Sequence, residues 1–234
     1  TASLYHNEID IGKAIKKSNI PRHELWITTK IKINDIKKGT KAIYNSIQNS
    51  LEHLDTKYLD LILLHGPVDG KLIDSWVALE EIMFGNVENL KNKVRYIGVS
   101  NYSIIHLDII LSICKIKPYA NQFEISPYLN KNKLIDYCKK NNIIVVAHTS
   151  LTRGNKICDL KLENISNRIK ISKPVILLAW ALHHDMVILP RSSNPNHIRE
   201  NITSIDVKLD IDTMNELNDF YKIDNYFMYS YYVD

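Results

Sequence analysis

Short apolar segments alternate with amphipathic segments along almost the whole chain, and this alternation limits the possible folds more than any other feature of the sequence. Apolar runs bounded by turn residues predict strands, and apolar residues spaced three and four apart predict helices. The expected strands are residues 25–29, 59–64, 94–99, 119–124, 143–147 and 187–189. The expected helices are residues 8–18, 38–53, 72–84, 103–113, 130–140, 174–184, 195–201 and 212–221. Strict alternation of the two kinds of segment predicts an α/β fold with a parallel sheet.

Two architectures satisfy this alternation: a doubly wound open sheet and a closed (β/α)8 barrel. No Gly-x-Gly-x-x-Gly segment follows any expected strand, which disfavours a Rossmann-type sheet. A barrel needs two further strands and typically about 250 residues, and this chain has 234. The chain begins in what reads as the loop after a strand, so a barrel without its first unit and a half fits the pattern. No linker interrupts the pattern, and residues 1–234 are expected to form a single domain.

The composition is that of an ordinary globular protein, with 45% hydrophobic and 24% charged residues. No apolar run approaches the roughly 20 residues that a membrane-spanning helix needs, and no secretory signal opens the chain. The three cysteines, Cys114, Cys138 and Cys158, form no Cys-x-x-Cys pair. Reduced thiols and a cytoplasmic location are therefore expected, and no metal site is predicted.

The formal net charge of +4 is compatible with a pocket for a phosphorylated ligand. Nucleic acid is not an expected partner, because the lysines are scattered and no nucleic-acid-reading motif is present. No membrane partner is expected either.

Three chemically distinctive residues are predicted at strand ends or at the start of the chain. Lys30 follows the strand expected at 25–29, His65 follows the strand expected at 59–64, and Tyr5 precedes the first helix. The carboxyl ends of parallel strands meet on one face, which carries the chemistry of barrel enzymes. A phenol, an ammonium group that favours its ionisation and a polar orienting imidazole are suited to general acid catalysis. Taken singly, each residue has an ordinary structural interpretation.

Five segments, in chain order, resemble the signature segments of the aldo-keto reductase superfamily. They are residues 1–8 with Ile11-Gly12, residues 63–67, residues 97–102, residues 121–124 and residues 189–194. The resemblance implies a (β/α)8 barrel, here lacking the first strand, the first helix and the second strand, and reduction of aldehydes and ketones with NADPH. It implies that Tyr5, Lys30 and His65 belong to a catalytic tetrad. The fourth member, an Asp, would immediately precede Thr1.

The resemblance also implies a set of cofactor-binding positions. Ser100, Asn101 and Gln122 match residues that hold the nicotinamide amide, and His148 replaces the aromatic residue that stacks under the ring. Thr149, Leu151 and Arg153 occupy the expected pyrophosphate loop. Arg191 and Ser192 match a pair that binds the adenosine 2′-phosphate, Glu200 and Asn201 match residues at the adenine edge, and His197 replaces an Arg. NADPH is therefore the expected cofactor, ahead of NADH.

The sequence thus predicts a cytoplasmic NADPH-dependent carbonyl reductase that acts on a small molecule as a monomer or weak oligomer. The aromatic residues between 221 and 232 are expected either to cover the substrate or to dock on the barrel. The alternative is a catalytically silent, cofactor-binding regulatory protein that resembles the potassium-channel β-subunits. The missing Asp, His148 and His197 favour that alternative, whereas Tyr5, Lys30 and His65 favour the enzyme.

Overall fold

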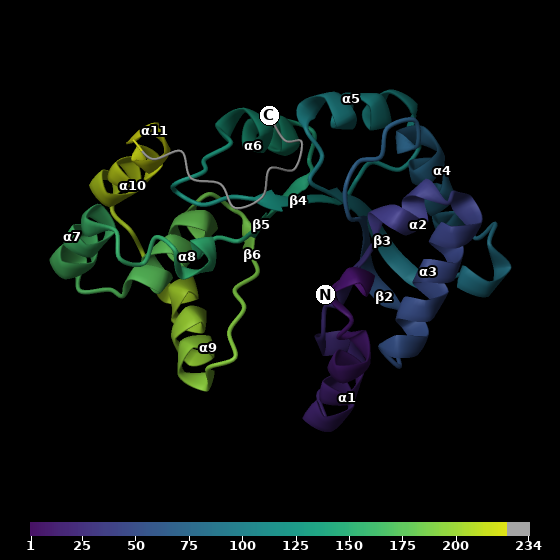
Figure 1. The fold of residues 1–234 in the computed structure, drawn as a ribbon, viewed down its shortest axis with the longest axis horizontal. Helices are drawn as coiled ribbons and strands as arrows, with labels where there is room; N and C mark the ends of the chain where they lie inside the picture. The colour runs from purple at the N-terminus through teal and green to yellow at the C-terminus, as the bar shows by residue number, and fades with distance from the viewer. Residues whose placement is uncertain (224–234) are drawn as a thin grey trace. The chain divides into compact units, whose positions relative to one another are not determined.

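Six strands in chain order make up the sheet of the computed structural model, which describes residues 1–223 (Figure 1). β1 pairs in parallel with β2, β2 with β3, and β5 with β6. The strands are β1 (Thr28–Ile31), β2 (Leu59–Leu64), β3 (Val94–Ser100), β4 (Ala120–Glu124), β5 (Ile144–His148) and β6 (Val187–Ile188). Each of the six expected strands is therefore present. β1 begins three residues later than predicted and extends through Lys30.

Helices separate the strands, as the periodicity predicted. They are α1 (Glu8–Ser18), α2 (Ile33–Lys37), α3 (Thr40–His53), α4 (Leu72–Met83), α5 (Ile104–Ile113), α6 (Asn132–Lys140), α7 (Leu160–Ile169), α8 (Lys173–His183), α9 (Pro195–Ile202), α10 (Ile211–Asn218) and α11 (Phe220–Ile223). Short 3-10 turns include η1 (Ser3–Tyr5), η2 (Arg22–Glu24), η3 (Glu88–Leu90), η4 (Thr152–Gly154) and η5 (Thr203–Asp206). α2 and α7 were not predicted. At the start of α7 the Asp159 side chain accepts from the N–H groups of Lys161 and Leu162, the usual N-cap arrangement.

The described chain divides into two units, residues 1–121 and residues 122–223. In the first unit every residue of β2 is buried, as expected for a strand that is covered on both faces. Ile43 and Ile47 of α3 and Trp76 and Leu79 of α4 are also buried. Gly98 of β3 is required by close packing, because a Cβ there would lie 2.7 Å from the Ala120 carbonyl oxygen.

The second unit is built around α8, whose residues from Val175 to Ala181 are all buried. The Trp180 Nε1 donates to the Asn218 Oδ1 at 2.8 Å and so ties α8 to α10. α10 begins after Asp210, which accepts from the Thr213 N–H and caps the helix.

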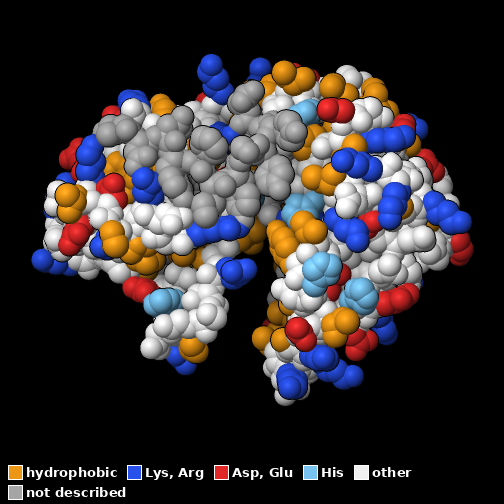
Figure 2. Space-filling view, viewed as in Figure 1, with side chains coloured by type: hydrophobic (Ala, Val, Ile, Leu, Met, Phe, Trp, Pro, Cys, Tyr) orange, Lys and Arg blue, Asp and Glu red, His pale blue; other side chains and the backbone are white. Residues whose placement is uncertain are grey.

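The surface carries charges of both signs. Figure 2 shows Lys and Arg side chains interspersed with Asp and Glu, without a continuous basic stripe on the face in view. None of the helices between residues 1 and 223 is long and apolar enough to cross a membrane. The aromatic residues expected either to cover the substrate or to dock on the barrel lie mostly beyond residue 223, outside the described residues.

Candidate active site

Tyr5 and Lys30 lie within hydrogen-bonding distance of each other in the first unit. The Lys30 Nζ donates to the Tyr5 Oη at 3.3 Å and to the Thr1 carbonyl oxygen at 3.2 Å. Lys30 is the third residue of β1 and is only 5% exposed, whereas Tyr5 belongs to η1 and is 51% exposed. The expectation that Lys30 follows the strand end was wrong by two residues, because β1 pairs with β2 up to Ile31. A buried cation therefore faces the hydroxyl of a solvent-accessible phenol.

Burial controls the protonation of Lys30. It lowers the pKa of the ammonium from 10.5 to about 8, because the charged form loses hydration. Among residues 1–223, no carboxylate pairs with this ammonium. At pH 7 Lys30 nevertheless keeps most of its positive charge, since its pKa lies about one unit higher.

His65 lies beside the phenol, directly after β2. Its ring meets the Tyr5 ring edge-on, with centroids 5.6 Å apart. Burial, and then the charge of Lys30, lower the pKa of His65 to about 4, so the imidazole is neutral at pH 7. Its Nδ1 is buried and has no hydrogen-bond partner among the described residues. A neutral imidazole can donate one hydrogen bond to a carbonyl oxygen without adding charge.

The strand register explains why Lys30, His65 and Ser100 are on the same side of the sheet. Lys30 pairs with Leu63, and Leu63 pairs with Gly98. Side chains alternate along a strand, so positions two residues beyond Leu63 and Gly98 face the same way as Lys30. Those positions are His65 and Ser100, and Ser100 is 1% exposed.

Asn101 links the end of β3 to the end of β2. Its Nδ2 donates to the His65 carbonyl oxygen at 3.0 Å and to the Ser100 Oγ at 3.2 Å. Its φ is +60°, a left-handed conformation that asparagine tolerates better than most residues. The two residues predicted to hold the nicotinamide amide in this unit therefore adjoin His65.

The remaining predicted cofactor positions belong to the second unit. Gln122 is buried in β4. His148 ends β5, and its Nδ1 lies 2.9 Å from the Thr149 Oγ1. Thr149 has a φ of +60°, which is unusual for a β-branched residue and marks a constrained turn. Leu151 and Arg153 follow in that turn.

The residues predicted to bind the adenosine phosphate and adenine lie just before α9 and within it. Arg191 and His197 are exposed, and Ser192 accepts a hydrogen bond from the Asn194 N–H at 3.1 Å. Asn201 is buried, and the Ser204 hydroxyl donates to its carbonyl oxygen at 2.7 Å.

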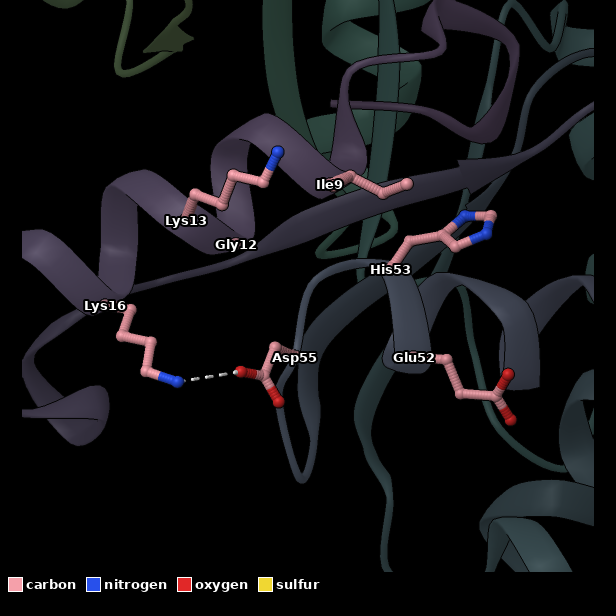
Figure 3. Close-up of a pocket in the computed structure, with 7 residues that line it drawn as sticks. All are labelled: Ile9, Gly12, Lys13, Lys16, Glu52, His53 and Asp55. Carbon is pink, nitrogen blue, oxygen red and sulfur yellow. Dashed lines mark ion pairs between the residues drawn. The ribbon is translucent and has the colours of Figure 1, made fainter.

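A surface groove of about 390 Å³ lies elsewhere, between α1 and the end of α3 (Figure 3). It is lined by Ile9, Gly12, Lys13, Lys16, Glu52, His53 and Asp55, none of which was predicted as a site residue. Among the described residues, no group of three or more His, Cys, Asp and Glu is placed to hold a metal ion.

Comparison with known proteins identifies the family. The family model described as "Aldo/keto reductase family" matches residues 1–157 and 152–222. The chain belongs to the aldo/keto reductase family. The resemblance predicted from the five sequence segments is thereby confirmed, and the chain is a member of a family of oxidoreductases.

Individual aldo/keto reductases are similar over most of their length. A 9,11-endoperoxide prostaglandin H2 reductase of Trypanosoma cruzi is 35% identical over 222 residues, which cover 94% of this chain and 76% of that protein. A glyoxal reductase of Bacillus subtilis is 36% identical over 221 residues, covering 93% and 77%. A crystal structure of an aldo-keto reductase from a Medee basin deep-sea metagenome library superposes with a TM-score of 0.91 at 30% identity, covering 100% of this chain and 84% of that one. The expected fold class, the α/β architecture of aldo-keto reductase barrels, is confirmed.

Proposed function

We propose that this aldo/keto reductase reduces small aldehydes and ketones to alcohols with NADPH, and that Tyr5 is the general acid. The observation that supports this proposal is the 3.3 Å contact between the Tyr5 Oη and the buried ammonium of Lys30, with a neutral His65 alongside.

Each residue has a physical role in carbonyl reduction. An ammonium close to a phenol favours the phenolate, and so makes the phenol a stronger acid near neutral pH. Tyr5 would donate its proton to the carbonyl oxygen as negative charge develops there, which is general acid catalysis. His65 would donate a hydrogen bond to the same oxygen and fix its orientation. Lys30 would supply the electric field and transfer no proton to the substrate.

The donor groups of the chain suit a pyridine dinucleotide. A nicotinamide amide needs one hydrogen-bond donor and one acceptor, which Ser100, Asn101 and Gln122 offer. When bound, NADPH supplies the hydride. In the second unit we propose that His148 stacks on the nicotinamide and that Thr149, Leu151 and Arg153 contact the pyrophosphate.

The adenosine end of the cofactor is assigned to the α9 region. Arg191 is exposed and can bind a 2′-phosphate through two parallel hydrogen bonds. We propose that Ser192 and His197 contact the same phosphate and that Glu200 and Asn201 bind the adenine. These contacts favour NADPH over NADH. We also propose that the protein is a cytoplasmic monomer or weak oligomer and that residues 1–234 belong to a single domain.

The proposal is tested by NADPH oxidation with a reactive aromatic aldehyde, measured on the full-length protein and on the Tyr5→Phe variant. Loss of the general acid should lower kcat/KM by about 10²–10⁴-fold while NADPH still binds. The matched control is Tyr96→Phe, because Tyr96 is 40% exposed in the same unit and its ring packs against Trp26 and Tyr119. NADH is offered in parallel to test cofactor preference.

Two results would contradict the proposal. Equal turnover in Tyr5→Phe and wild type would remove Tyr5 from the mechanism. Tight NADPH binding by the wild type without turnover of any carbonyl compound would favour the silent cofactor-binding protein instead.

A further inference from the structure

Glu8 is a buried carboxylate close to the candidate active site that the proposed mechanism does not use. It is the first residue of α1, three positions after Tyr5, and is 4% exposed. Its Oε1 accepts from the Thr29 Oγ1 at 2.6 Å, and its Oε2 lies 3.6 Å from the His53 Nδ1. Thr29 immediately precedes Lys30 in β1. One carboxylate therefore connects the segment that carries Tyr5 with the strand that carries Lys30.

A second contact fastens the same segment to β1. The Ser3 Oγ donates to the Lys30 carbonyl oxygen at 3.0 Å. Ser3 and Glu8 lie on either side of Tyr5, so both ends of this short segment are attached to adjacent residues of one strand. Tyr5 is itself half exposed. These two attachments fix the backbone on both sides of the residue whose hydroxyl contacts Lys30.

The third contact joins Glu8 at the start of α1 to His53 at the end of α3. His53, which ends α3, faces α1 in the groove shown in Figure 3, and its side chain is 51% exposed. Glu8 thus receives a hydrogen bond from β1 on one oxygen and faces an imidazole from α3 on the other. The carboxylate joins three elements at one point.

We propose that Glu8 is a positioning residue, which acts through Thr29 to hold the Tyr5 hydroxyl against the Lys30 ammonium. This inference rests on the proposed roles of Tyr5 and Lys30. A hydroxyl that shifts by about 1 Å loses its alignment with both the cation and the carbonyl oxygen, and such shifts can lower rates by up to about 10²-fold.

The test compares two pairs of variants in the full-length protein. Thr29→Val removes the hydroxyl donor and keeps the shape, whereas Thr29→Ser restores the donor. Glu8→Leu removes the acceptor, whereas Glu8→Gln keeps an acceptor oxygen for Thr29. One readout is kcat together with the Kd of NADPH. The other is the titration of Tyr5 by NMR of protein labelled with ¹³C at the tyrosine ζ-carbon, with Tyr5 assigned by Tyr5→Phe.

We expect Thr29→Val and Glu8→Leu to lower kcat by about 10- to 100-fold with little change in NADPH affinity. Their Tyr5 resonance should titrate at higher pH than in wild type, because the ammonium is no longer held next to the phenol. Thr29→Ser and Glu8→Gln should stay close to wild type. The control is Glu80→Gln, since Glu80 is also 4% exposed but accepts from the Lys115 and Ile116 N–H groups at 2.6 and 2.7 Å. It should lower stability and leave the Tyr5 titration unchanged.

An unchanged Tyr5 titration in folded Thr29→Val and Glu8→Leu would overturn the positioning role. Because that titration requires no turnover, it gives a result even if the wild type reduces no carbonyl compound. Failure of the proposed reaction and failure of the positioning role are thus separate outcomes.

Discussion

At the scale of single residues, the burial of Lys30, whose catalytic role is proposed above, carries a cost in stability. The residue is 5% exposed, and burial lowers the pKa of its ammonium from 10.5 to about 8. The folded protein therefore holds a poorly hydrated charge at neutral pH. Groups placed for catalysis often reduce stability in this way.

Lys30→Met should make the protein more stable at pH 7, by about 1–3 kcal/mol, while abolishing carbonyl reduction. The unfolded chain binds more protons than the folded one between pH 8 and 10.5, so wild-type stability rises with pH in that interval. The advantage of the Met variant should accordingly shrink towards about pH 10. Urea unfolding of both proteins at pH 7 and at about pH 10 measures the difference in unfolding free energy. A Met variant that is less stable than wild type at pH 7 would contradict the interpretation.

At the scale of elements, the packing of α1 on the end of α3 depends on one glycine. A Cβ on Gly12 would lie 2.7 Å from the Leu54 carbonyl oxygen and 3.0 Å from the His53 carbonyl oxygen. Both are backbone atoms and cannot move aside as a flexible side chain would. The close approach also brings Glu8 within reach of His53.

Gly12→Ala tests this packing. In an exposed helix the change would stabilise by roughly 0.5–1 kcal/mol, because alanine favours helix. Here overpacking should reverse the sign and destabilise the protein by about 1–3 kcal/mol. Lys13→Ala is the control on the same helix, since the Lys13 side chain is 68% exposed. Thermal or urea unfolding of the two variants gives the comparison, and a stabilised Gly12→Ala would show that α1 can shift without cost.

At the scale of the whole molecule, buried titratable groups make the free energy of unfolding depend on pH. His65 is held neutral, with its pKa lowered from 6.5 to about 4 by burial and then by Lys30. The unfolded chain binds its proton below about pH 6.5, whereas the folded protein does so only near pH 4. The stability that depends on neutral His65 is therefore full above pH 6.5 and is lost as the pH falls towards 4.

His65→Gln should reduce this acid sensitivity. Between pH 7 and pH 4 we expect wild type to lose about 2 kcal/mol more unfolding free energy than the variant, since buried carboxylates affect both proteins equally. Urea unfolding at several pH values gives the two curves. If the unfolding free energy of the two proteins fell equally between pH 7 and pH 4, His65 would not contribute to acid unfolding.

The predicted elements agree best with the structure where their bounds depend on residues that are neighbours in the sequence. The helix expected at residues 8–18 has those bounds, and all six strands are present. α7 was missed, although its buried Leu162 and Ile165 lie three residues apart, a spacing that is typical of an amphipathic helix. β1 began later than expected because pairing with β2, rather than local composition, sets its limits.

The six strands, most of the helices, the family and the candidate residues could all be predicted from the sequence. These follow from apolar periodicity and from short motifs, which are properties of neighbouring residues. The burial of Lys30 and the contacts of Glu8 with Thr29 and His53 became known only from the folded chain. Burial and contacts between residues 21 and 45 positions apart depend on how helices pack on strands and on one another, and no local sequence pattern encodes that packing.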